Sequence, residues 1–247
     1  MKKYLLIPIL AVVFFASCKK GAVTDCFYST GNIETETRSV HDFNSLLLRD
    51  NVNLVLKKSD SNYIVVEAGS NLINGIITDV SESGILEIRN DNNCNWIRSF
   101  ETPIFVYLNY IDIDSIEYRS IGDITTVGTL VTDSLWIMAH EGAGLIKMEL
   151  DVDLLHCSLH YGTMDIVLSG KSGLSYVYSS GFGLINMVDI ESGFIYVNNR
   201  SSNNMYVRSE KHLSATIESI GNIYYAGNPS TVIFDKTGTG ELIKLQD

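Results

Sequence analysis

Two histidines, His140 and His160, carry the side chains with the clearest potential for metal chemistry in this chain. Imidazole is a common ligand of transition metals, and two rings on neighbouring turns of a repeating fold could share one ion. The matching positions in the next two repeats are Ser179 and Asn199, which complete no coordination sphere. We therefore expect a polar ladder beside a turn, with no metal and no cofactor.

Several carboxylates raise the question of a polysaccharide-acting enzyme, because lyases and glycosidases with β-helical folds use acidic residues. Such acids must converge within about 5–10 Å of one another in a cleft. The acids at or after the expected corners share no constant position in the repeat: Asp123, Glu141, Asp165, Asp189 and Glu191. The chain also shows no serine-hydrolase or phosphate-cradling motif. We expect a protein that is not an enzyme, and an enzyme acting on polysaccharide is the weaker alternative.

Outward-facing aromatic side chains are a further candidate for binding. The spacing places on the outside Trp136, Tyr161, Phe182 and Tyr225. Exposed rings suit contact with carbohydrate or protein. Packing against a loop, a subunit or the first hundred residues is the favoured explanation, so the sequence assigns no ligand-binding residue.

The beginning of the chain predicts where in the cell the protein is located. Lys2 and Lys3 precede an apolar run, residues 4–15, that is too short to span a bilayer as a helix. The segment "FFASCKK" then resembles the lipobox of bacterial lipoproteins, which implies that residues 1–17 are a signal peptide and that Cys18 is lipidated. Several acyl chains form a stable membrane anchor. The alternative is an ordinary secretory signal with an incidental cysteine.

The charge of the chain excludes some partners. Loss of residues 1–17 would leave 16 basic and 29 acidic residues. Nucleic acid and anionic headgroups repel such a protein, so the membrane would be reached through the lipid alone. The remaining cysteines are odd in number, and whether Cys26 and Cys94 form a disulfide stays open. Cys157 falls at an inward strand position and is expected to be a small buried hydrophobe.

The elements that must position these residues are strands. Residues 18–39 are polar and are interpreted as a tether, and alternating apolar and polar residues begin near Val40. A short helical turn is expected over 71–80. From Ile116 onward, apolar residues recur every 19 or 20 positions, and two columns are expected to face inward: Ile116, Leu135, Leu155, Leu174, Phe194, Leu213 and Val232, and two residues later Tyr118, Ile137, Cys157, Tyr176, Tyr196, Ala215 and Phe234.

Glycine-rich corners separate these strands, as in the related phrases "HEGAGLIKM" (140–148) and "SSGFGLINM" (179–187). Glycine suits corners where the backbone needs a positive φ or where stacked turns leave no room for a Cβ atom. Two short strands and one corner per 20 residues predict a β-solenoid whose rungs stack about 4.8 Å apart. A sandwich of ordinary hairpins is the alternative.

The order of these features resembles one family. The lipobox, the segment "VNLVL…YIVVEAGSNLINGIITDV…GILEI" and corners such as "GLIN" (183–186) are similar to the putative auto-transporter adhesin, head GIN domain family of Bacteroidetes envelope proteins. The resemblance covers residues 40–245. It implies an all-β, right-handed β-helix-like solenoid and an adhesive role, and it supplies no catalytic residues.

The sequence thus predicts a signal peptide (1–17), a polar tether (18–39) and a β-solenoid domain (40–247) with one short helix near its start. The expected function is a lipid-anchored envelope module for adhesion or ligand binding, with a protein or glycan as the ligand. A structural or self-assembling scaffold is the alternative, so a homo-oligomer remains open. Lys19 and Lys20 follow the lipid cysteine where surface-exported relatives tend to have acids. This favours the periplasmic face of the outer membrane, although surface display stays open.

Overall fold

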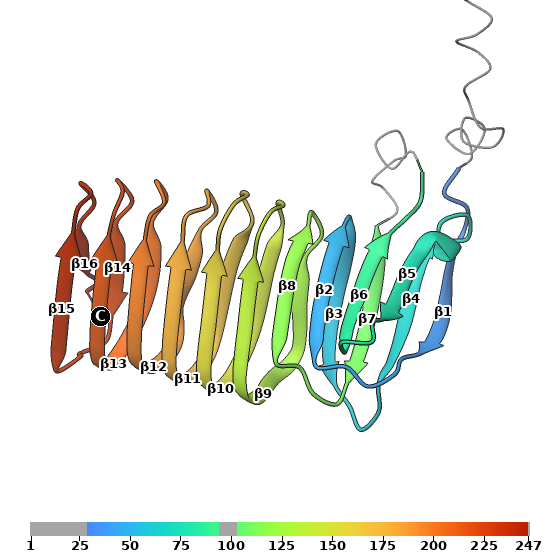
Figure 1. Cartoon of the computed structure of the whole chain (residues 1–247), viewed down its shortest axis with the longest axis horizontal. Coiled ribbons are helices and arrows are strands. Elements are labelled where there is room, and N and C mark those ends of the chain that lie inside the picture. The colour runs from blue at the N-terminus through green and yellow to red at the C-terminus, as the bar shows by residue number, and fades with distance from the viewer. Residues whose placement is uncertain (1–28, 94–102, 247) are drawn as a thin grey trace, which may run out of the picture.

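The computed structural model describes residues 29–93 and 103–246, which form one long stack of β-strands (Figure 1). Strands near the start are short, whereas five long strands fill the middle. The strands are β1 (Ile33–Ser39), β2 (Ser45–Asp50), β3 (Val52–Lys58), β4 (Tyr63–Gly69), β5 (Ile76–Val80), β6 (Ile85–Asn90), β7 (Ile104–Tyr110), β8 (Ser115–Ser120), β9 (Ile124–Ala139), β10 (Leu145–Leu159), β11 (Asp165–Ser179), β12 (Ile185–Asn199), β13 (Met205–Ile217), β14 (Ile223–Ala226), β15 (Thr231–Lys236) and β16 (Leu242–Lys244).

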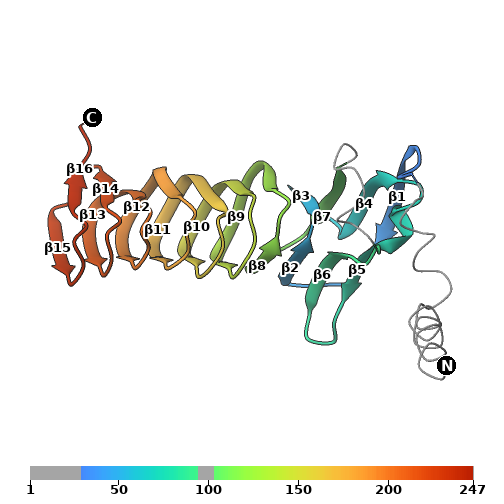
Figure 2. The same cartoon turned by 90° about the horizontal axis from the view of Figure 1, so that it is seen from above.

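The strands form two layers around a narrow core, as the view along the other axis shows (Figure 2). Each of β9 to β13 bends near its middle and contributes its first half to one layer and its second half to the other. We call the first layer the one that runs β1-β4-β7-β3, then the first halves of β9 to β13, then β14 and β16. The second layer runs β5-β6-β2-β8, then the second halves of β9 to β13, then β15.

Pairing from β9 to β15 and β16 is parallel and sequential, so each rung lies on the one before it. The expected all-β solenoid with rungs of roughly 20 residues is confirmed, with about six turns. A parallel rung cannot bury its apolar side alone, and the stack supplies the missing neighbour on each side. Among the described residues, no helix is long and apolar enough to cross a membrane.

The first rungs do not follow chain order. Strands β2 and β3 lie between the β6 and β7 rung and the β8 and β9 rung, so Leu48 of β2 pairs with both Ile88 and Tyr118. Figure 1 shows β2 between β6 and β8. A segment early in the sequence is thus inserted between two that come later.

The start of the domain differs from the sequence prediction in two details. Residues 33–39, assigned to the polar tether, form β1, which pairs antiparallel with β4. The expected short helix over 71–80 is reduced to a single 3-10 turn, Ile73–Gly75, followed by strand β5. The apolar residues Ile76 and Ile77 favour the strand, because β-branched side chains fit a pleated surface better than a helix.

The inner columns of the second layer confirm the predicted core on β8, β9, β10 and β13 and correct it on β11 and β12. Leu135 and Leu155 are in register and fully buried, but the next position in that column is Ser175, followed by Ile195 and Leu213. The second column continues from Ile137 through Cys157, Val177 and Val197 to Ala215. The predicted inward positions at Leu174, Phe194, Tyr176 and Tyr196 are therefore wrong by one residue, and these side chains lie on the outer face.

Buried serines at the bend explain this shift of one residue. Ser172 and Ser192 occupy successive rungs and donate hydrogen bonds of 3.2 Å to the carbonyl oxygens two residues ahead. Ser175 donates to Ser172 Oγ (2.9 Å) and its Oγ lies 3.1 Å from Ser192 Oγ. A buried hydroxyl is tolerated when it is hydrogen-bonded, so a serine takes a core position that the apolar pattern assigns to leucine.

The corners require glycine because the backbone of each corner lies very close to the backbone of the preceding rung. A Cβ atom on Gly183, in the phrase quoted above, would overlap the carbonyl oxygen of Met164 in the preceding rung. Gly142, at the earlier copy of that corner, has φ +124°, a conformation that side chains rarely adopt. The repeated phrase therefore marks the corner of the solenoid, as expected.

Candidate functional site: an aromatic ladder on the second layer

The outer face of the second layer carries a column of stacked rings. Trp136, His156, Tyr176 and Tyr196 occupy one register position on β9, β10, β11 and β12. Their ring centroids are 3.6, 4.9 and 5.3 Å apart in that order, with interplanar angles of 5°, 16° and 19°. On β13 the column reaches Ser214, and the ring of His212, which is in register with Phe194, lies 5.5 Å from Tyr196. Parallel in-register strands place like side chains one rung apart, which is close to ring-stacking distance. We call this column the aromatic ladder.

A second row of side chains runs beside the ladder. His140 and His160 stack at 5.0 Å, and Tyr178 lies 5.4 Å from His160. Between the two rows lies a shallow hollow of about 470 Å³. Polar groups also line the hollow: Ser158 between His156 and His160, and Asn198, Ser214 and Thr216 on the later rungs.

The ladder presents ring edges to solvent and hides most of the ring faces. Trp136, Tyr176 and Tyr196 are each exposed by 41–42%, although each ring is covered on one or both faces by a neighbour. A ligand on this surface would meet ring edges, tyrosine hydroxyls and imidazole nitrogens at a repeat of one rung. The arrangement suits an extended ligand that lies along the stack more than a single sugar ring stacked on one aromatic face.

The histidines within the stack favour the neutral form. Burial lowers the pKa of His156 below its ordinary value of 6.5. Burial and the neighbouring His140 lower the pKa of His160 in the same direction. His156 and His160 are therefore mainly neutral at neutral pH.

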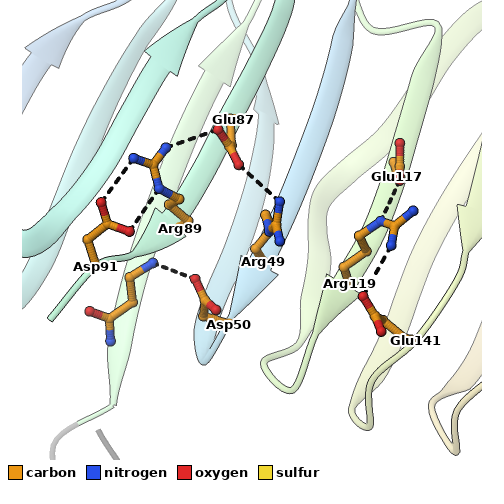
Figure 3. A network of polar contacts seen from close by, with 9 residues as sticks. Arg49, Asp50, Glu87, Arg89, Asp91, Glu117, Arg119 and Glu141 are labelled. Atoms are coloured by element: carbon orange, nitrogen blue, oxygen red, sulfur yellow. Dashed lines mark hydrogen bonds and ion pairs between the residues drawn. The ribbon is translucent and has the colours of Figure 1, made fainter. Parts of the chain in front are cut away.

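The other half of the same layer carries charges (Figure 3). Arg89 binds both carboxylate oxygens of Asp91 at 2.9 Å, lies 3.0 Å from Glu87 and shares Glu87 with Arg49 at 3.6 Å. These residues belong to the neighbouring strands β2 and β6, apart from Asp91, which follows β6. We use the name ion ladder for these four residues together with a second cluster, formed around Arg119 of β8.

The second cluster of the ion ladder joins it to the aromatic ladder. Arg119 of β8 contacts Glu117 at 2.6 Å and Glu141 at 3.1 Å. Glu117 also lies 3.9 Å from Nε2 of His140, the first ring of the second row. The change from charge to aromatic rings thus occurs at the step from β8 to β9.

The structure places the two histidines as the spacing predicts, stacked on neighbouring rungs. Among the described residues, no three histidine, cysteine or acidic side chains gather closely enough to hold a metal ion. Glu141 near them is bound to Arg119. The pair forms part of the ring stack, and the geometry gives it no third ligand.

The acids considered as catalytic candidates do not converge. Asp123 directly precedes β9 and Asp165 begins β11, and each accepts a hydrogen bond from a backbone N–H of the next rung, Leu145 (2.9 Å) and Leu184 (2.8 Å). Asn204 accepts in the same way from the N–H of Asn222 (3.0 Å). The sequence prediction missed this structural role, which the alternation of Asp or Asn at one corner position could have indicated. Asp189 and Glu191 lie exposed on β12.

The four predicted outward aromatics have different positions. Trp136 heads the ladder, whereas Tyr161 and Phe182 extend from the corners with about two thirds of each exposed. Tyr225 is partly buried and packs against the core, which corrects its outward assignment. The rest of the ladder was missed because Tyr176 and Tyr196 were assigned to the core.

The cysteines fall into two groups. Cys157 is buried in an inner column, as expected, and burial raises its pKa to about 12, so its thiol stays protonated and unreactive. Cys18, Cys26 and Cys94 lie outside the described residues, as does the predicted signal peptide.

The geometry defines a class, a parallel β-solenoid with a column of stacked aromatic rings on one outer face. Residues 42–229 match the family described as "Putative auto-transporter adhesin, head GIN domain", and the chain belongs to that family. A comparison with curated proteins finds no match.

Solved structures share the fold. A putative adhesin from Bacteroides fragilis is 19% identical, with a TM-score of 0.80 over 87% of this chain and 97% of that one. A putative lipid binding protein from Parabacteroides distasonis is 19% identical, with a TM-score of 0.70 over 88% and 98%. A putative adhesin from Parabacteroides merdae is 17% identical, with a TM-score of 0.65 over 88% and 98%. At these identities the likeness establishes the fold alone.

Proposed function

We propose that the chain is a cell-envelope adhesion or ligand-binding module without catalysis, held to the outer membrane through a lipid on Cys18. Membership of the adhesin family supports the adhesive role. The aromatic ladder is the single observation that carries the site, because it stacks four partly exposed rings in register along an outer face. The family's Bacteroidetes neighbours support the envelope location.

The ladder supports binding over chemistry. Its polar groups repeat at one rung without the two differentiated acids that glycoside cleavage needs. The acids beside the ladder and its hollow are paired with arginines: Glu117 and Glu141 with Arg119, and Glu218 with Arg200. Ring edges and hydroxyls at a regular repeat would instead contact an extended glycan or polypeptide along its length.

A glycan array read with the purified chain tests both parts of this proposal. The expected result is binding to extended polymers that the double variant Tyr176→Ser/Tyr196→Ser reduces at least tenfold. Tyr206→Ser is the matched control, because Tyr206 stacks on Tyr224 at 4.9 Å in the first layer. Equal loss in both variants would remove the ladder as the site, and new reducing or unsaturated ends in the bound glycan would show an enzyme.

The anchor is tested separately in cells. Cys18→Ser is expected to release the chain from the membrane fraction, whereas a chain that stays membrane-bound would contradict lipid anchoring. Protease added to intact cells would then distinguish the surface from the periplasmic face.

A further inference from the structure

The two ends of the stack are built differently. At the beginning, β1 has the polar sequence IETETRS and pairs antiparallel with β4, so it closes the first layer with alternating charges. Charged residues on an edge strand discourage pairing with another chain. At the other end, β15 has the sequence TVIFDK, and all six of its residues are exposed.

Strand β15 nevertheless has the side-chain pattern of an inner rung. Val232 is in register with Leu213, and Phe234 with Ala215, both of which are fully buried in the rung below. Val232 and Phe234 remain 43% and 39% exposed because the described part of the chain places no strand beyond β15 in this layer. Half of the backbone N–H and C=O groups of an edge strand also point away from its only neighbour.

We propose that β15 pairs with β15 of a second copy of this chain, antiparallel across a twofold axis, so that the second layer continues through the dimer. Opposite residues of an antiparallel pair lie on the same face of the sheet. Centring the axis on Ile233 sets Val232 opposite Phe234 of the other copy and Ile233 opposite its own equivalent. This register puts both apolar inner side chains on the core side and gives the free backbone groups partners.

A second copy meeting end to end in this way fits better than a head-to-tail stack. A head-to-tail contact would join β15 to the charged strand β1 or to β5 and would generate an open filament. The twofold contact joins β15 to β15 and gives a closed dimer. The formal net charge of −11 opposes the approach of two copies, so association should strengthen when salt screens that repulsion.

Disulfide trapping tests the register directly. Residues opposite each other in an antiparallel pair have Cα atoms about 4.5–5.5 Å apart, within the range that a disulfide bridges. Ile233→Cys in the whole chain, oxidised in the envelope, is expected to give a covalent dimer on a non-reducing gel. Val131→Cys is the matched control, because Val131 is also exposed but lies at the bend of β9. No dimer at position 233, or equal dimer at both positions, would overturn the proposal.

Sedimentation of the whole chain in mild detergent tests the energetics. The protein mass is expected to double with concentration and salt, and Ile233→Lys should keep it monomeric by placing two like charges in contact. Val131→Lys should dimerise like the unchanged chain. Because Ile233 is outward and half exposed, its replacement should leave the fold intact, which circular dichroism would check. A monomer at every concentration, or a dimer that Ile233→Lys does not weaken, would show that β15 is not this interface.

Discussion

The ion ladder and the aromatic ladder occupy the same face of the same layer, yet they use opposite chemistry. The ion ladder covers β6, β2 and β8, which are neighbours in space but far apart in the chain. The aromatic ladder covers β9 to β12, which stack in chain order. Consecutive rungs are brought together by the short corners between them. Strand β2 instead pairs with strands that lie about 40 and 70 residues further along the chain.

Ion pairs accompany this long-range pairing (Figure 3). The register sets Arg49 of β2 directly opposite Arg119 of β8, whereas Glu87 of β6 lies opposite Leu47 and reaches Arg49 diagonally at 3.6 Å. Asp50 accepts a hydrogen bond from the backbone N–H of Asn90 at 3.1 Å. Like charges directly opposite each other repel, so Glu87 and Glu117 offset the repulsion between arginines that this register brings together. Where chain order already sets the neighbour, the face is free for rings that can serve binding.

The largest effect we expect comes from interrupting the aromatic ladder. Tyr176→Ser removes the contacts with both His156 and Tyr196. Stacked pairs are worth about 0.5–1.5 kcal/mol each, so the free energy of unfolding should fall by about 1–3 kcal/mol. Urea unfolding followed by circular dichroism measures this loss, and a change within about 0.5 kcal/mol, the usual range of surface substitutions, would show that the rings do not support one another.

A smaller effect is expected in the ion ladder. Arg119→Gln removes the contacts with Glu117 and Glu141 on a partly exposed surface. Exposed ion pairs contribute about 0–1 kcal/mol and are screened by salt, so the loss should be small at low salt and vanish at high salt. The same urea unfolding at two salt concentrations measures it. A loss as large as that of Tyr176→Ser would remove the energetic distinction between the two ladders.

The smallest effect we expect is a difference in the pH at which the two ladders lose their contribution to stability. The folded pKa of His156 and His160 lies below the unfolded value of 6.5, so their stabilising contribution is complete above pH 6.5 and is lost as the pH falls through the folded pKa. Bonding to Arg89 lowers the pKa of Asp91 below its ordinary 3.8, so that pair weakens only in stronger acid. Melting temperature against pH should decline first below pH 6.5.

The variant His156→Phe checks the assignment of this first decline. It keeps a ring between Trp136 and Tyr176 but removes one of the two titrating groups, so the decline below pH 6.5 should become shallower. Arg89→Gln should leave that region of the curve unchanged. The opposite pattern would assign the mild-acid step to the ion ladder.

Much of the fold was predictable because consecutive repeats stack on one another, so equivalent positions in the sequence become neighbours in space. Inner positions such as Leu135, Leu155 and Leu213 follow from period and alternation, and the corner at Gly183 follows from glycine spacing. The candidate site was predicted less well. Only Trp136 was recognised as a binding candidate. Tyr176 resembles a core residue because the preceding Ser175 resembles a surface residue, and Tyr196 follows Tyr176 in the same column.

The sequence by itself determined an all-β solenoid with rungs of about 20 residues and glycine corners, because apolar period and backbone freedom are properties of the local chain. The tertiary structure decided which side of β11 and β12 faces inward and where β2 and β3 are inserted. The hydrogen bonds of Ser172 and Ser192 satisfy hydroxyls on the inward side of these two strands, and the insertion depends on pairing between strands distant in sequence. Neither is written in the spacing of residues, since both depend on partners that meet only when the rungs are stacked.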